Sequence, residues 1–500
     1  MKKLAVLGLS VSALILVACS NSAEKKSELD IVTTFYPVYE FTKQVAGNTA
    51  DVELLVEAGT EPHDYEPSAK DIAEIQEADA FVYENENMET WVSKLDSKKV
   101  KAIKATEGMV LLPGGEEEEH DHGHEEGHEG HHHAYDPHVW LSPERAIKMV
   151  ESIRDQLSKK FPDKKATFEK NAAAYIKKLT ALDKKYDDSM AQAKQKAFVT
   201  QHTAFAYLAL DYGLKQVGIT GVSADTEPTV ARLAELSKYV KDNGIKYIYF
   251  EENASKKVAE TLAKETGAKT AVLNPLESLT REEMKKGEDY ISVMESNLKS
   301  LEKTTSQAGP EIKPETAAET AKTVYNGYFA DADIKDRELS DYAGEWQSVY
   351  PLLKDGTLDQ VFDYKAKLKG DMTAAEYKAY YDTGYKSDIS NINIKGDTME
   401  FVVNGKSEKH TYKYVGYKVL NYKKGNRGVR FLFEATDANP GQFKYVQFSD
   451  HGIAPSKAFH FHIFYGNTSQ DEILNELENW PTFYPSDKSG IEIAQEMMAH

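Results

Sequence analysis

The stretch Asp136-Pro137-His138-Val139-Trp140-Leu141-Ser142-Pro143-Glu144 decides how the first part of the chain is organised. Ser142 is a favourable helix N-cap, and proline suits the next position because the first N–H groups of a helix have no partner within it. Helical periodicity continues from there past one interruption at Pro162. The stretch therefore predicts a long helix with His138 directly before it.

Short β-rich runs alternate with helical patterns on both sides of this helix. Runs typical of strands occupy residues 31–35, 51–56 and 80–83 before it, and 197–201, 246–250 and 270–273 after it. Helical patterns follow Ser68 and occupy residues 230–241 and 255–265. Such alternation is typical of α/β folds. We predict two α/β lobes over residues 31–305, joined by the long linking helix.

Three histidines and one glutamate stand near the ends of these elements: His63, His138, His202 and Glu277. Ligands of open α/β sheets gather outside the carboxyl ends of the strands. Three imidazoles and a carboxylate suit a closed tetrahedral zinc site, although nitrogen ligands alone do not exclude nickel or copper. Each residue taken singly is more often a surface residue than a ligand. Their joint placement predicts one zinc site in the cleft between the lobes.

The charge and the single cysteine narrow the function further. The chain has 81 Asp and Glu against 61 Lys and Arg, and its net charge of −20 opposes nucleic-acid binding and favours cations. One cysteine cannot build a cysteine-rich metal cage, so metal ligation must use carboxylates and the 15 histidines.

The start of the chain has the form of an export signal. Met1-Lys2-Lys3 precedes a short apolar run that ends in Leu16-Val17-Ala18-Cys19, which resembles the bacterial lipobox. We expect a lipoprotein signal peptide over residues 1–18, lipidation of Cys19, and a tether over residues 19–30. The protein would then be held at the extracellular face of the bacterial cell membrane.

A low-complexity segment at residues 116–133 contains seven histidines among Glu and Gly: His120, His122, His124, His128, His131, His132 and His133. Residues 124–128 match the HExxH pattern of zinc proteases, but that motif needs an amphipathic helix, which a glycine-containing segment of this kind does not favour. The segment is either a solvated acidic run or an auxiliary metal-collecting loop, and its composition favours the second. Its zinc affinity should be lower than that of the cleft, because ordering a flexible loop costs entropy.

The last part of the chain differs in composition. After a linker at residues 306–319, residues 320–500 contain 27 of the 48 Tyr and Phe residues, in short alternating runs. Asn404-Gly405 is typical of a β-hairpin turn. We predict a β-rich barrel with helices at its start and end.

Three histidines near the end of this part form a second candidate site: His451, His460 and His462. Strand alternation places His460 and His462 on one face, with Phe459, Phe461 and Ile463 on the other. A pair of solvent-facing histidines is the alternative. His410 and His500 are expected to be ordinary surface residues.

Residues 31–305 resemble the metal-binding lipoproteins of ABC importers, cluster A-I, in the segments around His63, His138 and His202 and in the lipobox. The resemblance implies a two-lobed solute-binding protein that captures zinc or manganese. Members that bind zinc tend to have histidine at the third ligand position, so His202 indicates zinc. Glu277 aligns with a position that is often Asp.

Residues 320–500 resemble the periplasmic zinc-binding ZinT family, which has a lipocalin-like fold. The family's three metal histidines match His451, His460 and His462, and Trp480-Pro481-Thr482-Phe483-Tyr484-Pro485 also looks characteristic of it.

Together these resemblances imply a monomeric, lipid-anchored protein that binds Zn²⁺ at two tight sites and delivers it to the permease of an ABC-type zinc importer. It is not expected to be an enzyme. Two alternatives remain: zinc-dependent hydratase or hydrolase activity in the C-terminal domain, because three histidines with an open position are also a catalytic pattern, and a surface adhesin.

Overall fold

The computed structural model describes residues 28–57, 60–114, 135–220, 228–251, 257–310, 322–423 and 425–498. The predicted signal peptide, Cys19, the histidine-rich segment 116–133 and His500 lie outside the described residues. Most of the predicted tether and linker lies outside them as well.

The first lobe is a four-stranded parallel sheet with strand order β2-β1-β3-β4. Its elements are β1 (Leu29–Thr33), α1 (Tyr36–Ala46), β2 (Ala50–Leu54), α2 (Ala69–Glu77), β3 (Ala80–Tyr83) and β4 (Ala102–Lys104). Every residue of β3 is buried, as expected for a strand covered on both faces. Ser68 caps α2 through a hydrogen bond from the backbone N–H of Asp71. The strands and the cap predicted from the sequence are confirmed.

The second lobe repeats this plan with strand order β6-β5-β7-β8. Its elements are β5 (Ala197–Thr200), α5 (Ala206–Asp211), β6 (Lys215–Gly218), α6 (Val230–Asp242), β7 (Tyr247–Phe250), α7 (Lys257–Thr266) and β8 (Lys269–Val272). All pairings are parallel, so the carboxyl ends of these strands lie at one edge of the sheet.

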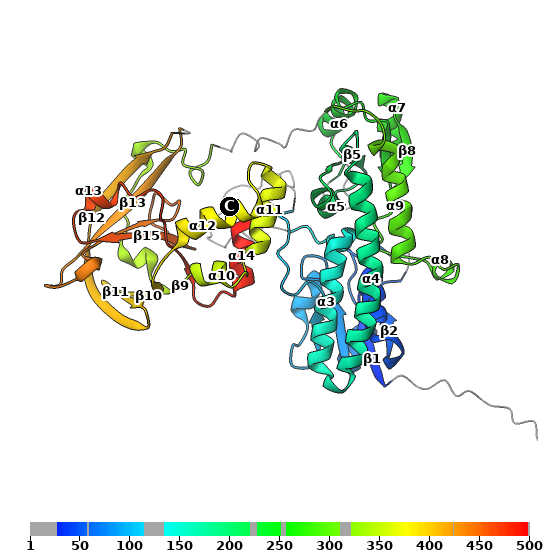
Figure 1. Ribbon diagram of the computed structural model, residues 1–500, viewed down its shortest axis with the longest axis horizontal. Helices are drawn as coiled ribbons and strands as arrows, with labels where there is room; N and C mark the ends of the chain where they lie inside the picture. Colours follow the sequence, from blue (N-terminus) through cyan, green and yellow to red (C-terminus); the bar gives the residue numbers. More distant parts are fainter. Residues whose placement is uncertain are drawn as a thin grey trace, which may run out of the picture.

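Two helices stand where the sequence predicts one interrupted helix. They are α3 (Pro143–Lys160) and α4 (Lys165–Met190), which pack against each other along their lengths (Figure 1). The turn that contains Pro162 reverses the chain, and the helical period does not report direction. The element that links the lobes is α4, since it packs on α1 of the first lobe and on α9 (Tyr290–Thr305), which contacts strands of the second. The short α8 (Arg281–Lys285) precedes α9.

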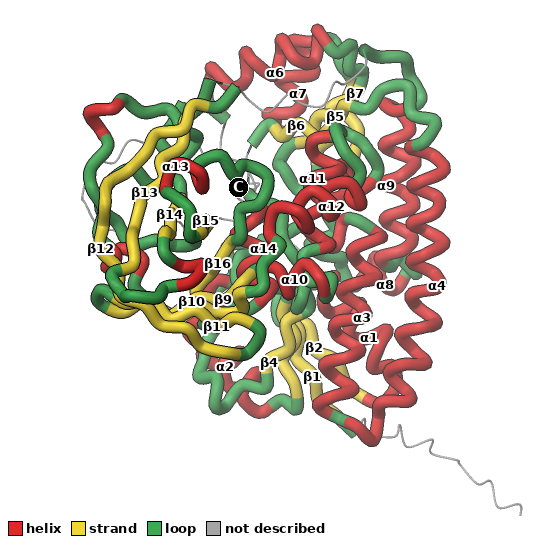
Figure 2. Tube along the Cα trace, turned by 60° about the vertical axis from the view of Figure 1, so that its left-hand side comes forward, coloured by secondary structure: helices red, strands yellow, loops and turns green. Residues whose placement is uncertain are grey.

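The C-terminal part is a closed eight-stranded antiparallel barrel (Figure 2). Helices were expected at its start and end, but three of them stand between its first and second strands, one stands before its last strand, and one follows that strand. The strands are β9 (Gly344–Ser348), β10 (Ile389–Lys395), β11 (Thr398–Val403), β12 (Lys406–Asn421), β13 (Arg427–Ala435), β14 (Tyr445–Ser449), β15 (Phe461–Gly466) and β16 (Thr482–Pro485). The helices are α10 (Tyr350–Lys354), α11 (Asp359–Lys369), α12 (Ala374–Tyr385), α13 (Gln470–Ile473) and α14 (Gly490–Met498). Asn404 and Gly405 have φ of 49° and 77° and turn β11 into β12, as predicted.

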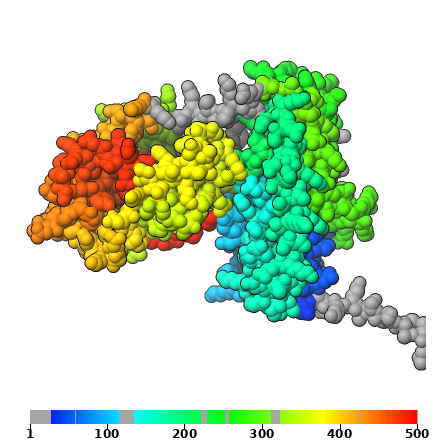
Figure 3. All heavy atoms as spheres, in the orientation of Figure 1, coloured from blue at the N-terminus to red at the C-terminus, as the bar shows by residue number. Residues whose placement is uncertain are grey.

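The barrel interior is a separate aromatic core built around residues such as Phe433, Phe448 and Phe461. The helices α10, α11, α12 and α14 instead share one apolar core with the first lobe and the α3–α4 pair. Figure 3 shows residues of α11 and α12, in yellow, against the cyan and green surface of the first part of the chain. Within the described part of the chain, no helix has the length and apolarity that crossing a bilayer requires.

Candidate metal centres

The first candidate centre draws on four segments of the two lobes. His63 lies in the loop between β2 and α2, and His138 directly precedes a short helical turn, Val139–Leu141, that leads into α3. His202 follows β5, and Glu277 follows β8. His138, His202 and Glu277 are buried, and His63 is partly buried. The structure thus brings together the four residues that the sequence singles out.

The side chains of this first group converge on Oε1 of Glu277. This atom lies 3.5 Å from Nε2 of His138, 3.5 Å from Nε2 of His202 and 3.9 Å from Nε2 of His63. Candidate ligand atoms of His63, His138 and Glu277 lie within 4.8 Å of one another. Among the described residues, the buried Nε2 of His202 and Oε1 of Glu277 have no hydrogen-bond partner. Buried polar atoms without partners are costly unless a ligand satisfies them, so this donor set fits a cation.

The second candidate centre lies in the C-terminal domain. His451, His460 and His462 each offer a ring nitrogen, and these atoms lie within 4.8 Å of one another. Their ring centroids are 5.7–5.9 Å apart. Tyr325 stacks on His451 at 4.6 Å, and Tyr484 stacks on His460 at 5.1 Å. Three nitrogens at this spacing can hold one metal ion and leave a further position for another ligand.

Comparison with known proteins identifies both halves of the chain. Residues 31–304 match the family model "Zinc-uptake complex component A periplasmic" (ZnuA), and residues 320–500 match "ZinT (YodA) periplasmic lipocalin-like zinc-recruitment". The zinc-binding lipoprotein AdcA of Streptococcus pneumoniae serotype 4 is 70% identical over 506 residues, with all of both chains covered. The chain belongs to the AdcA family. The two resemblances predicted from the sequence are therefore confirmed.

A second AdcA sequence and a crystal structure of AdcA are also similar to this chain along most of its length. The zinc-binding protein AdcA of Streptococcus pyogenes serotype M3 is 60% identical over 492 residues, with 95% of each chain covered. The crystal structure of Zn(II)-bound AdcA from S. pneumoniae is 69% identical and superposes with a TM-score of 0.85, covering 94% of this chain and 100% of that one.

Two carboxylates behind the histidines fix the orientation of the first centre in this AdcA-family chain. Oδ1 of Asp136 lies 2.7 Å from Nδ1 of His138 and also accepts a hydrogen bond from the backbone N–H of His138. Glu251, which follows β7, forms a short contact with Nδ1 of His202. A carboxylate on Nδ1 holds the proton there and leaves Nε2 free to bind a metal.

Burial and neighbouring charges shift the pKa values of the groups in the first centre. Burial, together with the proximity of His138, lowers the pKa of His63 to about 4. Burial alone would lower the pKa of His202, but the neighbouring carboxylates of Glu251 and Glu277 raise it to about 10. Burial would raise the pKa of Glu277, but His138 and His202 hold it below the usual value. The pKa of Glu61 rises to about 7 because it is buried beside Glu277.

Glu61, Asp136 and Glu251 were not identified from the sequence as carboxylates that lie beside the candidate ligands. Asp136 stands two residues before His138 in the stretch that decides the fold, so its position was visible in the sequence. Glu251 was detectable as a residue at the carboxyl end of a predicted strand. Glu61 lies two residues before His63, and its carboxylate accepts a hydrogen bond from the His63 backbone N–H at 3.2 Å.

Two expectations for the C-terminal domain are corrected. Phe459 was expected to share the inward face with Phe461 and Ile463, but it precedes β15 and its side chain is 64% exposed, whereas the other two are fully buried. His410 was expected at the surface, but its side chain is only 12% exposed and Nδ1 lies 3.5 Å from Asp437. The sequence alternation holds only within the strand, and packing against Phe443 covers the His410 ring.

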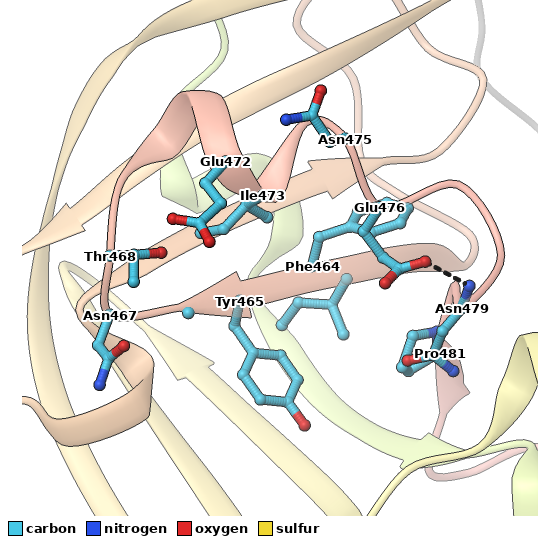
Figure 4. A pocket seen from close by; sticks show the side chains of 12 residues that line it. Phe464, Tyr465, Asn467, Thr468, Glu472, Ile473, Asn475, Glu476, Asn479 and Pro481 are labelled. Atoms are coloured by element: carbon cyan, nitrogen blue, oxygen red, sulfur yellow. Dashed lines mark hydrogen bonds between the residues drawn. The ribbon is translucent and has the colours of Figure 1, made fainter.

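A cavity of about 530 Å³ lies between β15 and α13 (Figure 4). Its lining is rich in amides and carboxylates, including Asn467, Asn475, Glu476 and Asn479. Glu476 caps the turn after α13 by accepting a hydrogen bond from the backbone N–H of Asn479 at 3.0 Å. None of the seven candidate metal ligands lines this cavity.

Proposed function

We propose that this protein captures Zn²⁺ outside the cell and delivers it to the permease of an ABC-type zinc importer. The observation that carries the proposal is the convergence of His63, His138 and His202 on the unpartnered oxygen of Glu277. Membership of the AdcA family supports zinc as the metal.

The donor set of the first centre favours storage and release of zinc over catalysis. Three imidazole nitrogens and one carboxylate oxygen complete a tetrahedral zinc site and leave no position for a reactive water. A nitrogen-rich set also favours zinc over manganese, which prefers oxygen ligands. The first centre, in the cleft between the two lobes, is therefore the site from which the permease receives zinc.

The C-terminal domain supplies a second, more exchangeable zinc site. His451, His460 and His462 provide three ligands, with water or an exogenous group as the fourth. This pattern also occurs in zinc hydratases, so the domain should be tested for hydration of carbon dioxide and for ester hydrolysis. We assign it zinc recruitment, in line with the ZinT-type family match of residues 320–500.

We assign Cys19 and the histidine-rich residues 116–133 to zinc capture as well. A lipid on Cys19 would hold the monomeric protein at the extracellular face of the membrane, near the permease. The histidines of residues 116–133 would raise the local zinc concentration beside the tighter sites.

Permease-dependent zinc uptake tests this function. The double variants H63A/H202A and H460A/H462A are each expressed in place of the native protein. His410→Gln serves as the control, because it removes a histidine outside both centres. We expect H63A/H202A to abolish uptake, H460A/H462A to impair it chiefly when zinc is scarce, and the control to leave it unchanged. Normal uptake by H63A/H202A would overturn the proposal.

A further inference from the structure

Helices of the C-terminal domain hold the backbone of a segment in the first lobe, Gly108–Leu112. The Gln360 side chain on α11 donates to the carbonyl of Gly108 at 2.8 Å and accepts from the N–H of Val110 at 3.2 Å. The Gln495 side chain on α14 accepts from the N–H of Leu111 at 2.7 Å and donates to its carbonyl at 2.8 Å. The hydroxyl of Tyr364 on α11 donates to the carbonyl of Val110 at 2.7 Å. The second domain therefore satisfies backbone groups that would otherwise need water.

The same segment is bonded to the backbone that presents His138. The N–H of Leu112 donates to the Tyr207 hydroxyl at 2.9 Å, and that hydroxyl donates to the carbonyl of Asp136 at 2.7 Å. The N–H of Asp136 donates back to the carbonyl of Leu112 at 2.9 Å. Because the Asp136 side chain orients His138, a shift of the held segment would move a proposed zinc ligand.

A buried charged cluster adds the second lobe to this contact. Arg145 at the start of α3 is 1% exposed and donates to both carboxylate oxygens of Asp211, in α5, at 2.7 Å. Arg145 also donates to the hydroxyl of Tyr364. Lys367 on α11 lies 3.0 Å from the same Asp211 carboxylate. Helix α11 thus contacts α3 and helix α5 of the second lobe together.

This arrangement couples the docking of the C-terminal domain to the geometry of the cleft. A buried arginine and aspartate are stable only while their partners remain in place, since an unpaired buried charge is strongly unfavourable. Opening of the lobes that separates Arg145 from Asp211 would have to break contacts with Tyr364 and Lys367 as well. The docked domain therefore opposes such opening.

We infer that the C-terminal domain is a positioning element of the cleft zinc site, in which Gln360, Tyr364 and Gln495 hold His138 in place and slow zinc release. This inference rests on the proposed function of the cleft and adds a regulatory role for the second domain. These three residues are positioning residues, since they act through Gly108–Leu112, Tyr207 and Asp136.

Zinc release from the cleft of the full chain tests the inference. The background carries H460A/H462A, so that the first centre is the one tight zinc site that remains. Transfer of zinc to a chromogenic chelator is followed by stopped flow. Tyr364→Phe removes only a hydroxyl, and Q360A/Q495A removes the backbone contacts. We expect release to be roughly 2- to 30-fold faster in both, the range that positioning contacts at a distance give. Lys378→Ala, which breaks an exposed ion pair between α12 and Asp359 of α11, should leave the rate unchanged.

The thermodynamic linkage between zinc binding and domain docking provides a second measurement, which a merely structural role of these residues would not affect. If docking strengthens zinc binding, zinc must strengthen docking by the same factor. Zinc should therefore slow amide hydrogen exchange at Val110 and Leu111 in the full chain, and this zinc-dependent protection should be reduced in Tyr364→Phe.

Native release rates in both variants, without zinc-dependent protection at Val110 and Leu111, would overturn the inference and leave the proposed function intact. A separate control, H63A/H202A on the same background, should bind no zinc tightly, because the histidines of residues 116–133 that remain are expected to bind it more weakly. If it retained tight zinc binding, the ligand assignment itself would be wrong.

Discussion

Oδ1 of Asp136 lies 2.7 Å from Nδ1 of His138, and this contact directs the other ring nitrogen of His138 to within 3.5 Å of Glu277. Asp136→Asn keeps the shape of the side chain but removes its charge, which weakens the orientation and basicity of the histidine. Partners of this kind contribute roughly 10- to 100-fold to metal affinity. Competition titration should therefore show a loss of that size at the cleft.

The matched control for this substitution is Asp437→Asn. Asp437 lies 3.5 Å from Nδ1 of His410, a carboxylate–histidine pair outside both candidate centres. An equal loss of affinity in the two variants would mean that Asp136 does not act through His138.

The cleft should depend more strongly on pH than the C-terminal centre. Zinc competes with protons for the ring nitrogens, so each raised pKa makes the proton the stronger competitor. The pKa of His202 is raised to about 10, whereas burial lowers the pKa of His451. Zinc affinity of the cleft should therefore keep rising as the pH increases from about 6 to about 9, while the C-terminal centre levels off at lower pH.

This order is the reverse of what ligand composition alone suggests, since a nitrogen-only site of equal burial would be the more sensitive one. The measurement is a competition titration of H460A/H462A and H63A/H202A across that pH range. A steeper rise for the C-terminal centre would show that Glu251 and Glu277 do not hold the proton on His202.

The barrel core supports the C-terminal centre directly. Phe461 lies between His460 and His462 in the sequence and packs on Trp346 and Phe448 at centroid distances of 4.7 and 4.8 Å. Phe461→Ala should lower the free energy of unfolding of the barrel by roughly 3–5 kcal/mol. Phe459→Ala, at a 64% exposed position, should change it by less than about 0.5 kcal/mol. Urea unfolding followed by tyrosine and tryptophan fluorescence compares the two; equal effects would refute the inward placement of Phe461.

Deleting residues 116–133 should leave the zinc affinity of the cleft nearly unchanged and slow zinc acquisition when the metal is scarce. The deletion can be closed with a short linker because Pro113 and Tyr135 form an antiparallel bridge. Affinity is measured by competition titration, and acquisition by growth with a zinc chelator. Loss of tight binding would mean that this segment supplies ligands to the cleft.

The local elements and ligand residues could be predicted from the sequence because they depend on short-range patterns. The strand ending at Thr200 follows from β-rich composition, and the helix starting at Pro143 follows from proline at its first position. Ser142 stands at the N-cap as expected, but its hydroxyl donates to Asp211 at 2.6 Å and does not cap the helix. The pairing of His202 with Glu251 could not be predicted, because it requires β5 and β7 to be neighbours with Thr200 opposite Tyr249. Strand order and register arise from packing of distant segments.

The packing of the C-terminal helices against the first part of the chain could not be predicted from the sequence either. Arg145 and Tyr364 belong to different halves of the chain, and their contact depends on a shared apolar core between α11, α14 and the first domain. Helical periodicity predicts a buried face but not the element that covers it. The reversal of the chain at Pro162 escaped prediction for a similar reason, since a proline interruption permits either a kink or a turn.

Anomalous diffraction at the zinc edge from crystals of the zinc-loaded full chain tests the central claim most directly. We expect one peak at about 2.0–2.2 Å from Nε2 of His63, His138 and His202 and from the Glu277 carboxylate, and a second peak among His451, His460 and His462. A cleft without a zinc peak, or a peak there that any of the four side chains fails to contact, would contradict the account.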